Sequence, residues 1–387
     1  MRKSHKPLIS LVIPTRERSE TLKFTLETAL NQTNDNFEII VSDNFSQDHT
    51  KRVVDDFADR RIKYINPGVR LSMVGNWNFA FESVVGEYVI FIGDDDGIMP
   101  GAIDRLQKII EARPSPIYSW KFHEYTWPID GAGAAITAIA PKSNPRELDL
   151  NGLVRFSVSW GAWRSYLLPG LYHSAVSRHI LDEVRNKTGK VFHSMAPDIF
   201  MQFALPVFSN SAVHIGESLT VNGRSEKSNS GSIIAKSGGQ TWSQFVREYG
   251  EYKGHVSLCP DVPVLINVIP DSVLVAMDLF PDYYRTMTFN YDAMWAYLHR
   301  MYKYETLLGI LRRRKKIQEH HSFSALKFLF FNMAHQLLEL RALVQRLCFN
   351  WKFNLRRDAP TNISDCVRMI SELEAGVRSA TSRRRMN

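Results

Sequence analysis

The stretch Tyr88–Gly97 constrains this chain more than any other part of its sequence. An apolar and aromatic run is followed by Gly93 and then by three consecutive aspartates, Asp94, Asp95 and Asp96. The short run, rich in β-branched and aromatic residues, predicts a buried strand that ends at the glycine. Three carboxylates at one strand end repel one another, so we expect a positively charged partner beside them.

A divalent cation is the simplest partner for these carboxylates. Mg²⁺ and Mn²⁺ prefer hard oxygen ligands, and they usually bind one or two carboxylates together with substrate phosphates. The sequence therefore indicates a Mn²⁺ or Mg²⁺ site at the end of this strand. The alternative is an acidic turn that caps a helix beginning near Pro100, because aspartate is common at such positions.

Strand and helix patterns alternate along the first 120 residues. Short apolar runs predict strands at Leu8–Ile13, Phe37–Val41, Ile62–Ile65, Tyr88–Ile92 and Ile117–Trp120. Amphipathic patterns predict helices that begin with Ser19 as N-cap, near Val53–Phe57, at Ser72–Val85 and at Ala102–Ile110. This alternation predicts an α/β fold with a Rossmann-like, mostly parallel sheet and helices on both faces.

Polar residues follow three of the predicted strands, at Pro14–Arg18, at Asp43-Asn44 and at Asp94–Asp96. Ligands of parallel sheets bind outside the carboxyl ends of the strands, so we expect these segments to meet at one edge. No Gly-x-Gly-x-x-Gly pattern follows the first strand, and no Gly-Lys-Ser/Thr loop is present. These absences from the sequence disfavour a dinucleotide-binding fold and a Walker-type ATPase.

Three segments of the sequence resemble a known family. Leu8–Gln32, Phe37–Thr50 and Gly86–Gly97 are similar to the nucleotide-sugar domain of family-two inverting glycosyltransferases, which have the GT-A fold. The resemblance is strong from Pro7 to about Trp120 and looser beyond it. It implies a GT-A domain, a nucleoside-diphosphate sugar donor and a divalent metal ion.

The resemblance assigns nucleoside binding to the turn after the first strand and to the end of the second strand. It implies that Pro14, Thr15 and Asp43 hold the nucleoside, and we predict donor contacts for Arg16 and Glu17. At the last of these positions the family more usually has asparagine.

On the diphosphate side, the resemblance assigns the metal and the diphosphate to Asp94–Asp96. The family often has Asp-x-Asp-Asp here, and in one register Gly93 stands in place of the first aspartate. We predict Asp94 and Asp96 as the metal ligands, and donor contacts for Asp94 and Asp95.

Arg70 and Asn76 correspond to a loop and a helix that face the donor in relatives, and we predict that both bind it. The alternative is a solvated loop arginine and a helix cap.

Asp198 is the predicted catalytic base. It follows Pro197 and precedes a helical apolar pattern, and relatives place a carboxylate at the start of a helix in this half of the domain. The alternative is a carboxylate that interacts only with the helix macrodipole. Three histidines are further candidates as donor-site or third metal ligands, although a lone histidine is more often structural: His173, His193 and His214.

Composition changes divide the chain into parts. We predict a GT-A domain at 1–225, with a nucleotide-binding half at 1–125 and an acceptor half at 145–225. The Gly-, Ala- and Pro-rich stretch Trp127–Asn144 is interpreted as a linker or flexible loop between the halves. A helical C-terminal region follows at 240–378, and a disordered basic tail at 379–387.

The positive charge of the chain lies in its C-terminal part. From Met301 onward, 17 Lys and Arg residues stand against 7 Asp and Glu residues. The basic run Arg312–Lys316 precedes the apolar segment Phe323–Leu347, which suits helix packing or a homo-oligomer first, and peripheral contact with an anionic membrane second. Nucleic-acid binding ranks last because no recognition module is visible, and we predict no nucleic-acid partner.

Cysteine spacing and the lengths of the apolar runs indicate the cellular compartment. The three cysteines are far apart and have no metal-ligand spacing, so we expect a reducing environment without a disulfide framework. No uninterrupted apolar run reaches the ~18 residues of a spanning helix, and the N-terminus lacks the apolar core of a signal peptide. We therefore predict a cytoplasmic protein, in possible peripheral contact with the inner membrane face.

These observations predict a metal-dependent inverting glycosyltransferase. It would transfer a sugar from a nucleoside-diphosphate sugar, with UDP as the family-level choice, to a glycan or lipid-linked acceptor. Two alternatives stay open: a non-catalytic nucleotide-sugar binding module, and a nucleotidyltransferase. The second usually has a Gly-rich, basic loop after its first strand, and Pro14–Arg18 contains no glycine.

Overall fold

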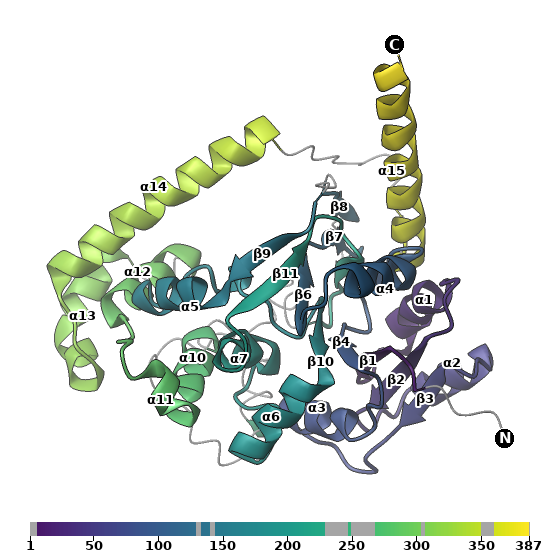
Figure 1. Cartoon of the computed structure of the whole chain (residues 1–387). Coiled ribbons are helices and arrows are strands. Elements are labelled where there is room, and N and C mark those ends of the chain that lie inside the picture. Colours follow the sequence, from purple (N-terminus) through teal and green to yellow (C-terminus); the bar gives the residue numbers. More distant parts are fainter. Residues whose placement is uncertain are drawn as a thin grey trace.

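The computed structural model describes residues 6–128, 133–139, 144–228, 247–248, 268–302, 306–349 and 360–386. These residues form a central sheet of eight strands in the order β3-β2-β1-β4-β10-β6-β11-β9 (Figure 1). The strands are β1 Ile9–Thr15, β2 Phe37–Asp43, β3 Ile62–Ile65, β4 Tyr88–Phe91, β6 Ile117–Trp120, β9 Arg146–Asp149, β10 Ser174–Ser177 and β11 Ser211–Ile215. The five strands predicted from apolar runs are β1 to β4 and β6.

The half of the sheet that carries the polar strand ends is parallel. β1 lies between β2 and β4, β3 follows β2, and the register sets Thr15 beside Asp43. Beyond β4 the sheet is mixed, because β10 runs antiparallel between β4 and β6. β10 comes from the predicted acceptor half, so the two predicted halves build one continuous sheet.

Helices cover both faces of this sheet (Figure 1). Successive residues of a strand point to opposite faces, so Leu11 and Ile13 of β1 join one hydrophobic cluster and Val12 joins the other. Burial on both faces explains why β1, β2 and β4 are nearly continuous apolar runs. The helices are α1 Ser19–Leu30, α2 Thr50–Phe57, α3 Met73–Phe81, α4 Ala102–Ala112, α5 Leu150–Ser159, α6 Arg178–Thr188, α7 Pro197–Ala204, α10 Val268–Leu279, α11 Pro281–Tyr284, α12 Tyr291–Tyr302, α13 Leu307–His320, α14 Ala325–Phe349 and α15 Ile363–Met386.

The start of α1 differs from the sequence prediction. Ser19 is the first helical residue, and Arg18 occupies the N-cap position without a side-chain cap. Oδ2 of Asp48 accepts a 2.9 Å hydrogen bond from the backbone N–H of Ser19. A carboxylate from a neighbouring loop therefore satisfies this helix end, which leaves the Arg18 side chain available for other contacts.

A smaller sheet lies beside the polar strand ends. Its order is β5-β12-β7-β8, formed by Gly97–Ile98, Thr220–Arg224, His123–Thr126 and Ala135–Thr137. The described part of the predicted linker therefore contributes a strand, β8, because it pairs with β7. This sheet brings β12 against the residues that follow β4.

The C-terminal helices pack in two places. Helices α10 to α14 extend the hydrophobic cluster on the α3–α7 side, and His335 of α14 stacks on both Trp160 and Trp163. Helix α15 instead returns to the N-terminal half, where Cys366 and Ile370 are buried in the cluster with β1.

The sequence predicts a disordered tail at 379–387. Helix α15 extends to Met386, because a helix anchored by buried residues in its first turns propagates at little further cost. No helix in the described part of the chain has the length and apolarity needed to cross a membrane.

Candidate functional site

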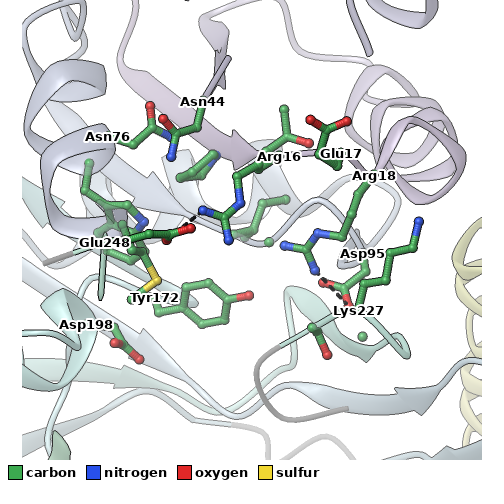
Figure 2. A pocket seen from close by; sticks show the side chains of 18 of the residues that line it. Arg16, Glu17, Arg18, Asn44, Asn76, Asp95, Tyr172, Asp198, Lys227 and Glu248 are labelled. Atoms are coloured by element: carbon green, nitrogen blue, oxygen red, sulfur yellow. Dashed lines mark hydrogen bonds and ion pairs between the residues drawn. The ribbon is translucent and has the colours of Figure 1, made fainter. Parts of the chain in front are cut away.

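A pocket of about 550 Å³ lies at the carboxyl ends of β1 and β4 (Figure 2). The residues that line it include eight of the predicted site residues: Pro14, Thr15, Arg16, Glu17, Arg70, Asn76, Asp95 and Asp198. Three predicted residues do not line it, namely Asp43, Asp94 and Asp96. The site is built from the turn after β1, the residues after β4, and the starts of α3 and α7.

The turn after β1 is held by Glu17. Its backbone has a φ of 53°, a left-handed conformation that non-glycine residues rarely adopt. The Glu17 carboxylate accepts hydrogen bonds from the backbone N–H groups of Gln47 at 3.0 Å and Asp48 at 3.2 Å. It also pairs with Arg70 at 3.2 Å. Glu17 thus joins three loops at the rim of the pocket.

Asp94 is completely buried beneath this turn. Its Oδ2 accepts a 2.6 Å hydrogen bond from the hydroxyl of Thr15. Its Oδ1 lies 2.7 Å from Nη2 of Arg18. Burial raises the pKa of Asp94 to about 6, and the charge of Arg18 opposes that rise.

Asp95 is the aspartate that lines the pocket. Its Oδ2 accepts hydrogen bonds from the backbone N–H and the hydroxyl of Ser225, at 2.9 and 2.6 Å. Nη1 of Arg18 lies 3.9 Å from the same oxygen. Burial raises the pKa of Asp95, against the opposing charge of Arg18.

Asp96 is directed into the protein. Its Oδ2 accepts hydrogen bonds from the hydroxyl of Tyr172 at 2.5 Å and the backbone N–H of Gly93 at 2.6 Å. Its Oδ1 accepts a 2.6 Å hydrogen bond from the N–H of Gly223, and His173 lies 3.3 Å from Oδ2. Burial opposes ionisation, but His173 and these hydrogen bonds outweigh it and hold the pKa of Asp96 below its ordinary value.

The geometry explains why position 93 is glycine. A Cβ there would lie 2.6 Å from the hydroxyl of Tyr172 and 2.9 Å from Oδ1 of Asp95. The Tyr172 hydroxyl and the neighbouring carboxylates therefore leave no space for a side chain at position 93. Gly223 is equally constrained, because a Cβ would lie 1.8 Å from the backbone oxygen of Asp95.

The predicted nucleoside residues fall into two groups. Asp43 is buried and accepts hydrogen bonds from the hydroxyl of Tyr64 at 2.6 Å and the amide of Asn66 at 3.2 Å. Asn76 lines the pocket, and its side chain accepts from the hydroxyl of Ser42 at 2.9 Å. Asn44, next to Asp43, also lines the pocket, so the pocket-facing polar residue after β2 is one position later than predicted.

Asp198 lies in the first turn of α7, directly after Pro197. It lines the pocket, and Figure 2 shows Tyr172 between it and Asp95 in that view. Burial raises the pKa of Asp198, although nearby N–H groups and His173 favour its ionised form. A carboxylate with a raised pKa beside a pocket has the properties of a general base.

The three candidate histidines have separate partners. His173 contacts Asp96 and also bonds to Thr220 at 2.8 Å. His193 bonds to Thr188 at 2.9 Å, and His214 to Ser119 at 3.1 Å. None of the three lines the pocket described here.

Sequence reasoning missed several pocket residues. Arg18 was not predicted as a site residue, although it stands in the turn that the resemblance assigns to the donor. Tyr172 belongs to the predicted acceptor half, and no local sequence signal connects it with Asp96. Lys227 and Glu248 also line the pocket, and Glu248 pairs with Arg16 at 2.8 Å (Figure 2).

The donor atoms at this site fit a divalent ion that is shared with a ligand. No group of three or more His, Cys, Asp or Glu side chains able to hold a metal occurs among the described residues. An ion that binds substrate phosphates needs only one or two carboxylates. Asp95 faces the pocket, and Oδ1 of Asp94 is buried with no hydrogen-bond partner. Both oxygens of Asp96 accept hydrogen bonds, so its role as a ligand stays a prediction.

A protein-family model matches residues 10–167 of this chain, and its description is glycosyl transferase family 2. Residues 10–167 belong to that family. The match confirms the resemblance noted in the sequence. Together with the sheet order β3-β2-β1-β4, it also confirms the predicted GT-A fold.

Curated relatives match this family 2 segment over part of their length. The chain is 37% identical over 105 residues to the GalNAc(5)-diNAcBac-PP-undecaprenol beta-1,3-glucosyltransferase of Campylobacter jejuni, covering 26% of this chain and 34% of that protein. It is 30% identical over 89 residues to the UDP-Glc:alpha-D-GlcNAc-diphosphoundecaprenol beta-1,3-glucosyltransferase WfgD of Escherichia coli, covering 23% and 35%. The chain therefore spans about a third of the length of these relatives.

One solved structure that matches this chain is that of S. aureus TarS in complex with UDP-GlcNAc. It matches at 15% identity and a TM-score of 0.49, covering 81% of this chain and 79% of that one.

Proposed function

We propose that this chain is an inverting glycosyltransferase that transfers a sugar from a nucleoside-diphosphate sugar to an acceptor hydroxyl. One observation carries the proposal: Asp95, Arg18 and Asp198 line a single pocket at the carboxyl ends of the parallel strands. Arg18 and a cation bound to Asp95 can offset the negative charge of a diphosphate, and Asp198 can accept a proton. The family match over residues 10–167 supports the same reaction class.

The donor would lie along the turn after β1. Asn44, Asn76 and Arg70 line the pocket and would offer polar groups to the nucleoside, while Arg18 and Asp95 would face the diphosphate. The name of the E. coli relative includes UDP-Glc as its donor, which supports a UDP-sugar here. Asp43 would act through the hydroxyl of Tyr64, which donates to it at 2.6 Å, and not by touching the donor.

Mn²⁺ or Mg²⁺ would be held by Asp95 and by Oδ1 of Asp94, which accepts no hydrogen bond, together with oxygens of the diphosphate. When bound, the ion neutralises the negative charge that develops on the leaving diphosphate. Asp96 would position this site through Tyr172 and Gly223.

Asp198 would remove the proton of the attacking acceptor hydroxyl. The acceptor oxygen forms a bond to the anomeric carbon while the bond from that carbon to the diphosphate oxygen breaks. The proton goes to the Asp198 carboxylate, and the bonding electrons leave with the nucleoside diphosphate. Attack from the face opposite the leaving group inverts the anomeric configuration.

The acceptor is proposed to be lipid-linked. The names of the C. jejuni and E. coli relatives both include an undecaprenol-linked molecule. Helix α14 adds a physical reason, because one row of its apolar side chains is exposed to solvent, spaced alternately by four and three residues: Leu326, Phe330, Met333, Leu337 and Leu340. Exposed Arg312, Arg314 and Lys315 lie on the preceding helix, α13.

This combination of an apolar row and basic side chains is typical of a helix that lies on an anionic membrane. We propose peripheral contact of α14 with the cytoplasmic membrane face, where a lipid-linked acceptor would be reached. A second copy of this chain on the same row is the competing occupant.

A transfer assay tests the proposed function. The full chain is incubated with a panel of sugar nucleotides and a lipid-linked acceptor, with and without Mn²⁺, and the anomeric configuration of the product is read by NMR. Asp198→Asn should lower kcat by about 10²–10⁴-fold while donor binding is kept. Asp182→Asn, which removes an acid paired with Arg185 at 2.7 Å outside the pocket, should leave kcat unchanged.

Three outcomes of this assay would overturn the proposal. Donor binding without transfer or hydrolysis would assign an inert binding module. Release of pyrophosphate from a nucleoside triphosphate, supplied in place of the sugar nucleotide, would assign a nucleotidyltransferase. Product with retained configuration would exclude direct attack with Asp198 as base.

A further inference from the structure

The guanidinium of Arg18 already occupies the place of a cation between two carboxylates. Its Nη2 lies 2.7 Å from Oδ1 of Asp94, and its Nη1 lies 3.9 Å from Oδ2 of Asp95. The side chain comes from the N-cap of α1, a position without a side-chain cap, and it lines the pocket (Figure 2). Positive charge at this point relieves the repulsion that the sequence predicted for the aspartates.

The contacts of this guanidinium are incomplete. Nη1 of Arg18 and Oδ1 of Asp94 are both buried, and neither has a hydrogen-bond partner in the described part of the chain. The close approach of Nη2 to Asp94 is therefore an ion pair without an aligned hydrogen bond. Buried donors and acceptors left in this condition are costly, so they are usually satisfied by a ligand, an ion or water. The unpartnered donor suits an anion, and the unpartnered carboxylate oxygen suits a cation.

The contacts of Asp96 provide the contrast. None of the groups around its two oxygens is a long cationic side chain that a metal ion could displace. These groups belong to Gly93, Tyr172, His173 and Gly223. An exchangeable pair exists at Asp94, where the partner is a long side chain that also faces the pocket.

We propose that Arg18 is an internal counter-ion that exchanges with the divalent cation of the donor. In the ligand-free protein the guanidinium offsets part of the negative charge of Asp94 and Asp95. When a divalent ion binds these carboxylates together with a diphosphate, the guanidinium leaves Asp94 and donates to the diphosphate oxygens. The inference rests on the proposed diphosphate site, and it adds a role for Arg18 that neither the sequence pattern nor the family match assigns.

The exchange makes two opposite predictions for one substitution. Arg18→Gln removes the competing charge, so binding of Mn²⁺ alone should tighten by about tenfold or more. The same change removes a donor to the phosphates, so binding of inorganic pyrophosphate in the presence of Mn²⁺ should weaken by about tenfold or more. A purely structural ion pair would not produce opposite changes.

The measurement uses the full chain and no sugar. Free Mn²⁺ is followed by electron paramagnetic resonance during titration of wild type, Arg18→Gln and Arg18→Lys, and pyrophosphate binding is measured by calorimetry. Arg105→Gln is the matched control, because Arg105 is similarly exposed and pairs with Glu217 at 3.5 Å outside this pocket. Its affinities for both ligands should equal those of wild type.

Arg18→Lys keeps the experiment decisive if Arg18→Gln does not fold. An ammonium retains the positive charge beside Asp94 but cannot present several donors at once. We expect wild-type affinity for Mn²⁺ alone and several-fold weaker pyrophosphate binding. Unchanged pyrophosphate binding in Arg18→Lys would overturn the exchange, as would Arg18→Gln with unchanged or weaker Mn²⁺ binding. Because no glycosyl transfer is measured, a failed transfer assay with these results intact would reject only the proposed reaction.

Discussion

The hydroxyl of Thr15 donates a 2.6 Å hydrogen bond to Oδ2 of Asp94. Thr15 ends β1 and Asp94 follows β4, and the two strands are neighbours in the parallel sheet. The bond therefore joins the predicted nucleoside turn to the predicted diphosphate site across one strand spacing. Because this bond holds Oδ2, the other carboxylate oxygen of Asp94, Oδ1, is the one that lies beside the guanidinium of Arg18.

Thr15→Val should destabilise the protein and weaken the donor site together. The substitution keeps the shape of the side chain but leaves Oδ2 of the fully buried Asp94 without its donor. We expect the free energy of unfolding, measured by urea denaturation, to fall by about 1–3 kcal/mol. Thr33→Val removes a 2.6 Å bond to Asp104 at an exposed site and should change it by less than about 0.5 kcal/mol. Equal effects of the two substitutions would contradict the buried role of the Thr15 bond.

The rate of transfer should depend on pH through Asp198. Burial raises the pKa of this carboxyl above the ordinary value of about 4. A base acts only when ionised, so kcat should fall as the pH is lowered through the raised pKa and should be full above it. A pH profile of kcat at saturating donor measures this limb. Asp198→Asn should lose the limb, and its persistence in that variant would assign the titration to another group.

His335 should make the stability of the fold sensitive to acid. Its ring is fully buried and stacks on Trp160 and Trp163, with centroids 5.5 and 4.7 Å apart. Burial lowers its pKa to about 4, and the charges of Arg300 and Arg164 act in the same direction. The unfolded chain takes up this proton near pH 6.5, so stability is full above about 6.5 and decreases as the pH falls toward about 4.

The size of this effect can be isolated by substitution. Urea unfolding at pH 7 and pH 4.5 should give a loss of up to about 3 kcal/mol from His335 in wild type, and that share should be absent in His335→Gln. His179→Gln changes a histidine whose side chain is 81% exposed and should retain the wild-type loss. An identical loss in His335→Gln and wild type would show that the stacked ring does not titrate as expected.

The exposed row of α14 should bind anionic lipid. Leu337→Glu places a charge in the middle of the row, where the wild-type side chain is 68% exposed, and should abolish cosedimentation with phosphatidylglycerol vesicles. Gln336→Glu adds the same charge at an exposed neighbouring position outside the row and should reduce cosedimentation only slightly. If wild type is a dimer in solution and Leu337→Glu is a monomer without a change in vesicle binding, the row is an interface between two copies.

The parallel part of the fold could be predicted from local patterns. β3 and β6 have the predicted bounds, and β1, β2 and β4 differ from theirs by one or two residues. These strands are buried on both faces, so their apolar runs are short, continuous and bounded by polar residues. β10 could not be placed in this way. It is a strand of four residues that pairs antiparallel with β4 and with β6, and nothing in its sequence indicates which strands lie beside it.

Local sequence patterns were enough to locate the strand ends that carry polar site residues, since polar residues directly after buried parallel strands lie at one edge of the sheet. The orientation and the contacts of each aspartate depend on the tertiary structure. Tyr172, Gly223 and Ser225 reach Asp95 and Asp96 from at least 76 residues away, and they turn one carboxylate into the protein and leave the other at the pocket. Three identical neighbouring side chains have the same local propensities, so only partners brought by the fold can give them different orientations and different pKa values.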